Sequence, residues 1–108
     1  MQPQDIGILI VDDEFSVRDS LASWFEADGY RVDTAADANE ALAKLQERKW
    51  NIVLLDIKMP GMDGIELQRH IKNIDANIIT IIITAFASVD TAIQALKDRS
   101  EEHTSELQ

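Results

Sequence analysis

Residues 51–64 read NIVLLDIKMPGMDG, and in this stretch four apolar residues, Ile52 to Leu55, run directly into the carboxylate of Asp56. An unbroken apolar run of this length is typical of a strand that is covered on both faces of a parallel sheet. A charge so close to a core is costly unless it has a partner. The stretch therefore predicts a buried strand, and it indicates that the acid at the end of this strand has a partner or a specific role.

Other apolar runs alternate with helical patterns on both sides of this stretch. Strands are also expected at residues 8–11 (ILIV), 30–34 (YRVDT) and 78–83 (IITIII). Helices are expected to open at Ser16, at Asp37 with Glu40 in a capping box, at Ile65 and at Ser88. Four alternations of strand and helix predict an α/β fold with a doubly wound parallel sheet, because each crossover is right-handed and returns the chain to the same edge.

The helices are expected to pack their apolar faces on this sheet. The side chains expected to face inward are Val17, Leu21, Trp24 and Phe25 in the first helix, Ala41, Leu42 and Leu45 in the second, and Ile71 and Ile74 in the third. The first helix is expected to end near Gly29. Trp50 is expected to be partly exposed at the entrance of its strand, and His70 to lie on the surface.

Composition limits the classes of function. A chain of 108 residues fits one small domain, and the absence of cysteine excludes disulfides and thiolate metal sites. No apolar run approaches the roughly 20 residues of a membrane span, and no signal peptide opens the chain, so a cytoplasmic protein is expected. With 20 acidic and 10 basic residues, the formal charge of -10 argues against a nucleic-acid surface in this segment.

Carboxylates are predicted to meet at one end of the sheet. The first strand ends in Asp12 and Asp13, the third in Asp56 and the fourth in Thr84, and parallel strands all end on the same rim. Grouped carboxylates repel, so either they lie farther apart than this pattern implies or a cation holds them. Oxygen ligands select a hard ion, and so few carboxylates suit Mg²⁺ better than a fully caged Ca²⁺. Helix capping or a solvated turn is the alternative role for Asp12 and Asp13.

Three motifs carry a family resemblance. ILIVDDE, LLDIKMPGMDG and IIITA, at these separations, resemble the receiver domain of bacterial two-component response regulators, in order over residues 6–98. The resemblance implies the flavodoxin-like receiver fold with strand order 2-1-3-4, truncated before the fifth strand and helix. It implies Asp56 as the phosphoacceptor, with Mg²⁺ held directly by Asp13 and Asp56. Its other implied site residues are Asp12, which would hold the metal through water, Lys58, whose backbone carbonyl would be a ligand, and Thr84, whose hydroxyl would contact the phosphoryl group.

The resemblance also implies partners and a role in phosphorelay signal transduction. A sensor histidine kinase or a small-molecule phosphodonor would supply the phosphoryl group, and the domain would switch conformation to control an output domain, expected to be transcriptional. It would be a phosphoacceptor that catalyses its own phosphorylation and not an enzyme in the usual sense. No contact of this segment with nucleic acid or membrane is expected, and a homodimer is conceivable in the full-length protein.

Two alternatives stay open for the function. A Mg²⁺-dependent phosphatase of the haloacid-dehalogenase type also carries an acid after its first strand, but it needs an Asp-x-Asp pair, and this chain has Asp12 and Glu14 there. A receiver-like interaction module that is never phosphorylated is the other alternative. A flavodoxin-like cofactor binder is disfavoured, because its first loop needs hydroxyl and glycine donors for phosphate and this chain offers DDEF.

The tail departs from the family pattern. A receiver domain is expected over residues 1–98, whereas residues 99–108, RSEEHTSELQ, read as a non-native or disordered polar tail. Suitably back-translated, this peptide looks like the start of a common sequencing-library adapter. A receiver would continue with a fifth strand that ends in a catalytic Lys. Expressed alone, residues 1–108 are therefore expected to aggregate and to be phosphorylated poorly.

Overall fold

A computed structural model describes residues 2–56 and 64–83 of the chain. Along the chain the elements are η1 (Pro3–Asp5), β1 (Gly7–Val11), α1 (Phe15–Ala27), β2 (Arg31–Ala35), α2 (Ala38–Glu47), β3 (Ile52–Leu55), α3 (Gly64–Ile74) and β4 (Ile79–Ile82). Every strand expected from the sequence is present, within one residue at each end. Residues 57–63, between β3 and α3, and the helix expected at Ser88 lie outside the described residues.

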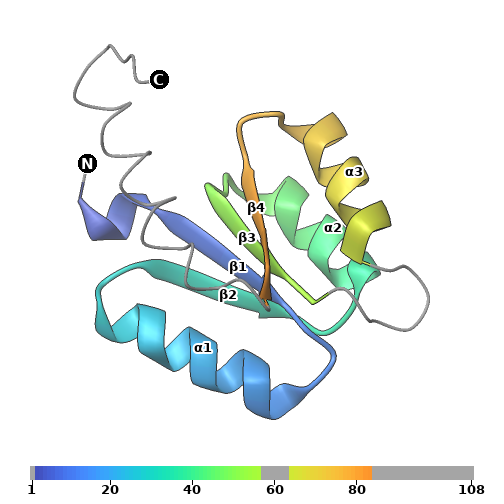
Figure 1. Cartoon of the computed structure of the whole chain (residues 1–108). Helices are drawn as coiled ribbons and strands as arrows, with labels where there is room; N and C mark the ends of the chain where they lie inside the picture. The colour runs from blue at the N-terminus through green and yellow to red at the C-terminus, as the bar shows by residue number, and fades with distance from the viewer. Residues whose placement is uncertain (1, 57–63, 84–108) are drawn as a thin grey trace.

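The strands form one parallel sheet in the predicted order, β2-β1-β3-β4. β1 pairs with β2 on one side and with β3 on the other, so the chain changes direction across the sheet at β1. Figure 1 shows α1 on one face of the sheet and α2 with α3 on the opposite face. The fold is therefore the doubly wound α/β arrangement that the alternation of strands and helices predicts.

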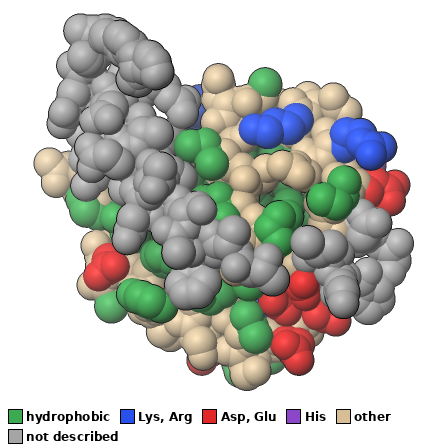
Figure 2. Space-filling model, viewed as in Figure 1, with side chains coloured by type: hydrophobic (Ala, Val, Ile, Leu, Met, Phe, Trp, Pro, Cys, Tyr) green, Lys and Arg blue, Asp and Glu red, His purple; other side chains and the backbone are tan. Residues whose placement is uncertain are grey.

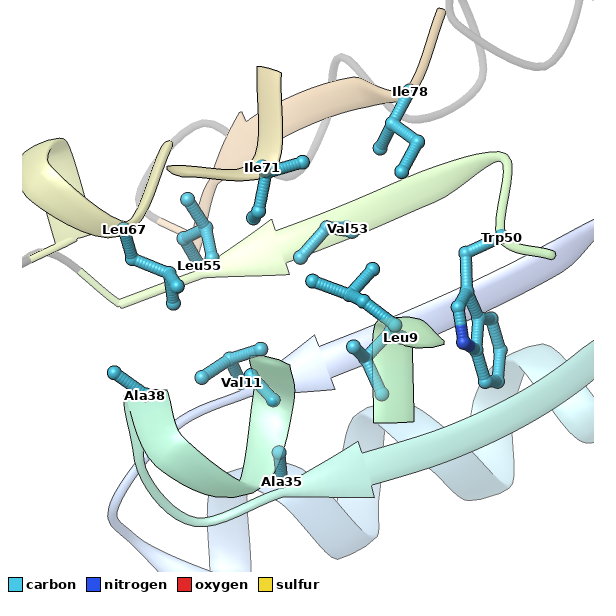
Figure 3. Packing of buried hydrophobic residues seen from close by; sticks show 12 residues of the cluster. Leu9, Val11, Ala35, Ala38, Trp50, Val53, Leu55, Leu67, Ile71 and Ile78 are labelled. Carbon is cyan, nitrogen blue, oxygen red and sulfur yellow. The ribbon is translucent and has the colours of Figure 1, made fainter. Parts of the chain in front are cut away.

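One hydrophobic cluster lies between the sheet and the pair α2 and α3. Leu9 and Val11 of β1 and Val53 and Leu55 of β3 face this side, and each is fully buried. In Figure 3 Trp50 lies at the amino end of the cluster, with Ala38 and Leu67 at the end toward which the strand arrows point. This packing determines which residues of β1 and β3 face α2 and α3.

A second hydrophobic cluster lies under α1. Leu21 and Phe25 of the helix pack against Ile8, Ile10, Ile52 and Leu54 of the sheet. Successive residues of β1 and β3 therefore alternate between the two clusters, as the period of a strand requires. Both central strands are buried on both faces, which explains why their sequences are continuously apolar.

α1 starts earlier than the sequence indicates. Ser16 was the expected cap, but the helix begins at Phe15 and Glu14 is its N-cap residue, with no side-chain capping hydrogen bond. The N–H of Glu14 donates to the Asp12 carboxylate at 2.8 Å, which fixes the chain just before the helix. The end agrees with the prediction, since Gly29 has a φ of 96° and accommodates the left-handed turn after the helix.

Two tryptophans exchange their expected environments. Trp24 is 56 % exposed and stacks on Phe25, which takes the place in the core. Trp50 is only 2 % exposed, because its Nε1–H finds an acceptor inside the protein, the backbone carbonyl of Lys44 at 3.0 Å. Hydrophobicity alone does not distinguish these two sites, and the buried indole is the one whose N–H has a backbone acceptor next to the core.

The other two helices agree with the predictions except at particular residues. In α2, Asp37 accepts the N–H of Glu40 at 2.8 Å as expected, but the Glu40 carboxylate accepts the N–H of Ala36 and not that of Asp37. In α3, Ile71 is buried, whereas Ile74 is 41 % exposed because it ends the helix. His70 is exposed, as predicted. Within the described ranges no helix is long and apolar enough to span a membrane.

Candidate metal centre

Asp12 and Asp56 lie beside each other because β1 and β3 are in register at their carboxyl ends. Val11 pairs with Leu55, the last residues of their strands. The ladder then continues for one more residue, since Asp56 donates its N–H to the Val11 carbonyl at 3.0 Å and Asp12 donates to the Ala35 carbonyl at 3.1 Å. Both acids are therefore held by the backbone of rigid strands, at the point where the strand order reverses direction.

The carboxylates of Asp12, Asp13 and Asp56 form a compact cluster. One oxygen from each lies within 4.8 Å of the others. Their exposure differs, because Asp12 is 3 % exposed, Asp56 is half-buried and Asp13 is exposed. Figure 2 shows acidic side chains gathered at the lower right of the view, near the end of the sheet where β1 and β3 stop in Figure 1. The cluster therefore extends from the exposed Asp13, which solvent reaches, to the buried Asp12.

Electrostatics make the cluster unfavourable in the protein alone. Burial raises the pKa of the Asp12 carboxyl above its ordinary value of 3.8, and the charges of Asp56 and Asp13 raise it further. The hydrogen bond from the Glu14 N–H lowers the same pKa but only offsets part of the rise. Asp12 therefore resists ionisation, and a cation bound beside it would relieve both the burial and the repulsion.

The loop between β1 and α1 is fixed by contacts from the helix. Arg18 donates from Nη1 to the backbone carbonyl of Asp12 at 2.7 Å. Its guanidinium carbon lies 5.6 Å from the centre of the Phe15 ring, in a cation–π arrangement. Sequence reasoning missed Arg18, and the only available signal was that it is the one basic residue in the first thirty.

The donors fit a hard divalent cation. Carboxylate oxygens are the ligands that Mg²⁺ and Ca²⁺ prefer, and burial together with the charges of Asp56 and Asp13 raises the pKa of Asp12, which a bound cation would offset. A site with two or three carboxylates at an open rim leaves room for water ligands, which suits Mg²⁺. Lys58 and Thr84, the other two predicted site residues, lie outside the described residues, so their roles stay predictions.

Comparison with known proteins places the chain among receiver domains. A family model of the response regulator receiver domain matches residues 8–103. The chain is 42% identical over 97 residues to the transcriptional regulatory protein ZraR of Klebsiella oxytoca, which covers 90% of this chain and 22% of ZraR. It is 45% identical over 83 residues to sporulation initiation phosphotransferase F of Bacillus subtilis, which covers 77% of this chain and 67% of that protein. The chain therefore spans about a fifth of the length of ZraR.

Solved structures give the same result. A CheY-like response regulator receiver domain protein from Methanospirillum hungatei superposes with a TM-score of 0.69 at 30% identity, over 89% of this chain and 91% of that chain. A chain in the complex of histidine kinase ThkA with response regulator TrrA superposes with a TM-score of 0.67 at 36% identity, over 71% of this chain and 66% of that chain. Sequence and structure thus agree on one family for the chain.

Proposed function

The chain belongs to the receiver-domain family of two-component response regulators, and from this premise we propose that Asp56 accepts a phosphoryl group in a Mg²⁺-dependent reaction. The observation that carries the proposal is the cluster of Asp12, Asp13 and Asp56, whose oxygens lie within 4.8 Å of one another at the carboxyl rim. Carboxylates this close repel one another, and a bound divalent cation would offset that repulsion.

Asp56 is the best placed of the three acids to act as the nucleophile. Asp12 is buried and one of its oxygens accepts the Glu14 N–H, whereas Asp13 is exposed on the loop. Asp56 directly follows the buried strand β3, and its N–H is bonded to Val11, so its main chain is fixed while its carboxylate is half-buried at the rim. A fixed and accessible carboxylate is what an in-line attack on phosphorus requires.

The proposed step is a simple transfer. One Asp56 carboxylate oxygen forms a bond to phosphorus, and the bond from phosphorus to the donor breaks, with its electron pair leaving on an imidazole nitrogen or on the acetate of acetyl phosphate. Asp13 and Asp56 would hold Mg²⁺ directly and Asp12 through water, with the Lys58 carbonyl as a further ligand. The bound ion would neutralise charge on the phosphoryl oxygens. Thr84 would donate its hydroxyl to one of those oxygens.

The partner we propose is a sensor histidine kinase. The complex of histidine kinase ThkA with response regulator TrrA contains a chain of the same fold, which supports this partner class. We propose a transcriptional output, since ZraR and the regulatory protein ResD of Bacillus subtilis are named as transcriptional regulators and this chain matches only part of each. The receiver would act on that output by changing conformation when Asp56 is phosphorylated.

Acetyl phosphate provides a direct test. The protein is expressed from the whole reading frame and incubated with acetyl phosphate and Mg²⁺, and intact mass is measured. One acid-labile phosphoryl group is expected, absent with a chelator and absent in Asp56→Asn. Asp19→Asn, a change of the same kind at an exposed position of α1, is the control and is expected to label normally.

The other outcomes identify the alternatives. Continuous release of inorganic phosphate without a stable adduct would indicate a phosphatase of the haloacid-dehalogenase type. No reaction with acetyl phosphate or with any histidine kinase would indicate an interaction module that is not phosphorylated. Label that persists in Asp56→Asn at a different residue would contradict the assignment of the nucleophile.

A further inference from the structure

Arg18 is tied to the acid cluster through the main chain. Its Nη1 donates to the backbone carbonyl of Asp12 at 2.7 Å. The same residue, Asp12, donates its N–H to Ala35 at 3.1 Å and accepts the Glu14 N–H on Oδ1 at 2.8 Å. Three hydrogen bonds thus surround Asp12, and the one from Arg18 is the only one of them that reaches it from within α1.

Repulsion between carboxylates acts on the loop that carries Asp12 and Asp13. Like charges within 4.8 Å push one another apart, and Asp56 is fixed by its place at the end of β3. The repulsion is most easily relieved by movement of the loop between β1 and α1, which after Asp12 forms no ladder hydrogen bonds with residues 2–56 and 64–83. Loops with few backbone hydrogen bonds are the parts of a protein that open first.

We propose that Arg18 is a positioning residue that holds this loop closed before the metal arrives, so that Asp12, Asp13 and Asp56 are already gathered when Mg²⁺ binds. This inference rests on the proposed function for the metal itself. The aromatic ring of Phe15, whose centre lies 5.6 Å from the guanidinium carbon, gives Arg18 a second contact. In this proposal neither side chain is a ligand of the metal or of the phosphoryl group.

Positioning and simple electrostatics make opposite predictions for Arg18→Met. Met keeps an unbranched side chain but removes the charge and the donor. If Arg18 acted only through its charge, its removal would strengthen Mg²⁺ binding, because a cation near the site repels another cation. If Arg18 holds the loop, its removal weakens Mg²⁺ binding. The direction of the change therefore decides between the two roles.

The experiment measures Mg²⁺ affinity by calorimetry, without a phosphodonor. Arg18→Met is expected to weaken Mg²⁺ binding about fivefold. Loss of a group bonded directly to a metal ligand's side chain typically weakens binding roughly 10- to 100-fold, and the effect here is smaller because Arg18 is bonded to the main chain. Arg18→Lys, which retains a donor, is expected to recover most of the affinity. The matched control is Arg48→Met, at the far end of α2, where the expected change is less than about twofold at ~0.1 M salt.

A second readout uses the metal-free protein, so it stands even if the chain binds no Mg²⁺. Amide hydrogen exchange at Glu14, whose N–H is bonded to Asp12, is expected to be about fivefold faster in Arg18→Met, while exchange at Leu21 in the middle of α1 stays unchanged. Absence of Mg²⁺ binding in the unmodified protein would overturn the proposed function alone. Unchanged or tighter Mg²⁺ binding in Arg18→Met, or equal acceleration at Glu14 and Leu21, would overturn the role of Arg18.

Discussion

At the amino end of the sheet, Trp50 is 2 % exposed beneath the guanidinium of Arg31, 4.9 Å from its ring centre, whereas at the carboxyl end three carboxylates lie within 4.8 Å of one another. Arg31 Nη2 donates to the Lys49 carbonyl at 2.7 Å, whereas its buried Nη1 has no hydrogen-bond partner among the described residues. The neighbouring Gly7 N–H donates to the Asn51 side chain at 2.8 Å. The amino end is therefore held mainly by the packing of the Trp50 ring and by hydrogen bonds.

The carboxyl end has the opposite character. Its acids repel, and burial raises the pKa of Asp12, so the folded protein would be more stable without some of these charges. Functional sites commonly hold such unfavourable groups, and the rest of the fold compensates for them. The difference between the two ends teaches that substitutions at the amino end should destabilise the protein, whereas removal of a charge at the carboxyl end should stabilise it.

The largest expected effect is at the amino end. Trp50→Ala should lower the free energy of unfolding by about 3–5 kcal/mol, because it leaves a cavity between α2 and the sheet and removes the hydrogen bond to Lys44. Trp24→Ala, the matched change at an exposed indole, should cost less than about 1 kcal/mol. Urea denaturation followed by circular dichroism measures both. Equal losses would show that the two ring environments do not differ in energy.

Gly7→Ala should have the next largest effect. A Cβ at Gly7 would lie 2.5 Å from Arg31 Nη2, so the guanidinium would have to leave its place over Trp50. The expected loss is about 1–2 kcal/mol in the same denaturation experiment, as for other overpacked sites. In an Arg31→Met background the loss should shrink to below about 0.5 kcal/mol, because the clashing group is gone. A loss of the same size in both backgrounds would mean that the strain arises elsewhere.

Asp12→Asn tests the carboxyl end and should stabilise the metal-free protein by about 1 kcal/mol at pH 7. Because folding raises the Asp12 pKa above 3.8, the native state binds more protons than the unfolded state just above that pH. The free energy of unfolding therefore falls as pH rises through the pKa that Asp12 has in the folded protein. Asn does not ionise, so the variant does not lose this stability. Below pH 3.8 the variant and the parent should converge. Asp19→Asn, the exposed control, should change stability by less than about 0.5 kcal/mol.

The smallest expected effect is at Asp33, an acid with the opposite pKa shift. Burial opposes its ionisation, but the hydrogen bonds from Lys44 at 2.9 Å and from the Thr34 N–H, together with the charges of Lys44 and Arg48, outweigh burial and lower the pKa below 3.8. Its stabilising contribution is present above pH 3.8 and is lost as pH falls through the folded pKa. Asp33→Asn should therefore lower the free energy of unfolding by about 0.5 kcal/mol at pH 7, a small value because the side chain is 43% exposed. Well below pH 3.8 the same substitution should leave the free energy of unfolding unchanged. Thermal denaturation at both pH values measures it.

The strand order and the gathering of Asp12, Asp13 and Asp56 could be predicted because they depend on local signals. Apolar runs of four or five residues mark the buried strands, and the parallel arrangement brings their carboxyl ends to one rim. Once the strands are assigned, the acids that follow β1 and β3 must be neighbours. No long-range contact has to be known for this step.

The details that sequence missed depend on contacts between distant residues. The start of α1 was misplaced because the Asp12 carboxylate, and not Ser16, organises the chain before the helix. The burial of Trp50 depends on a carbonyl of Lys44 that the helical pattern does not reveal. Arg18 was missed because its acceptor is a backbone carbonyl, which has no signature in the sequence.

The pairing of Val11 with Leu55 also bears on which changes in chain length this gene can accept. Residues 8 and 10 of β1 are in phase with residue 12, and residues 52 and 54 of β3 are in phase with residue 56, so one inserted residue in either strand would turn its acid to the opposite face of the sheet. Two inserted residues would restore the face but displace the acid by about 7 Å along the strand. We expect related genes to exchange Ile, Leu and Val freely within these strands, while insertions and deletions are confined to the loops at the amino end.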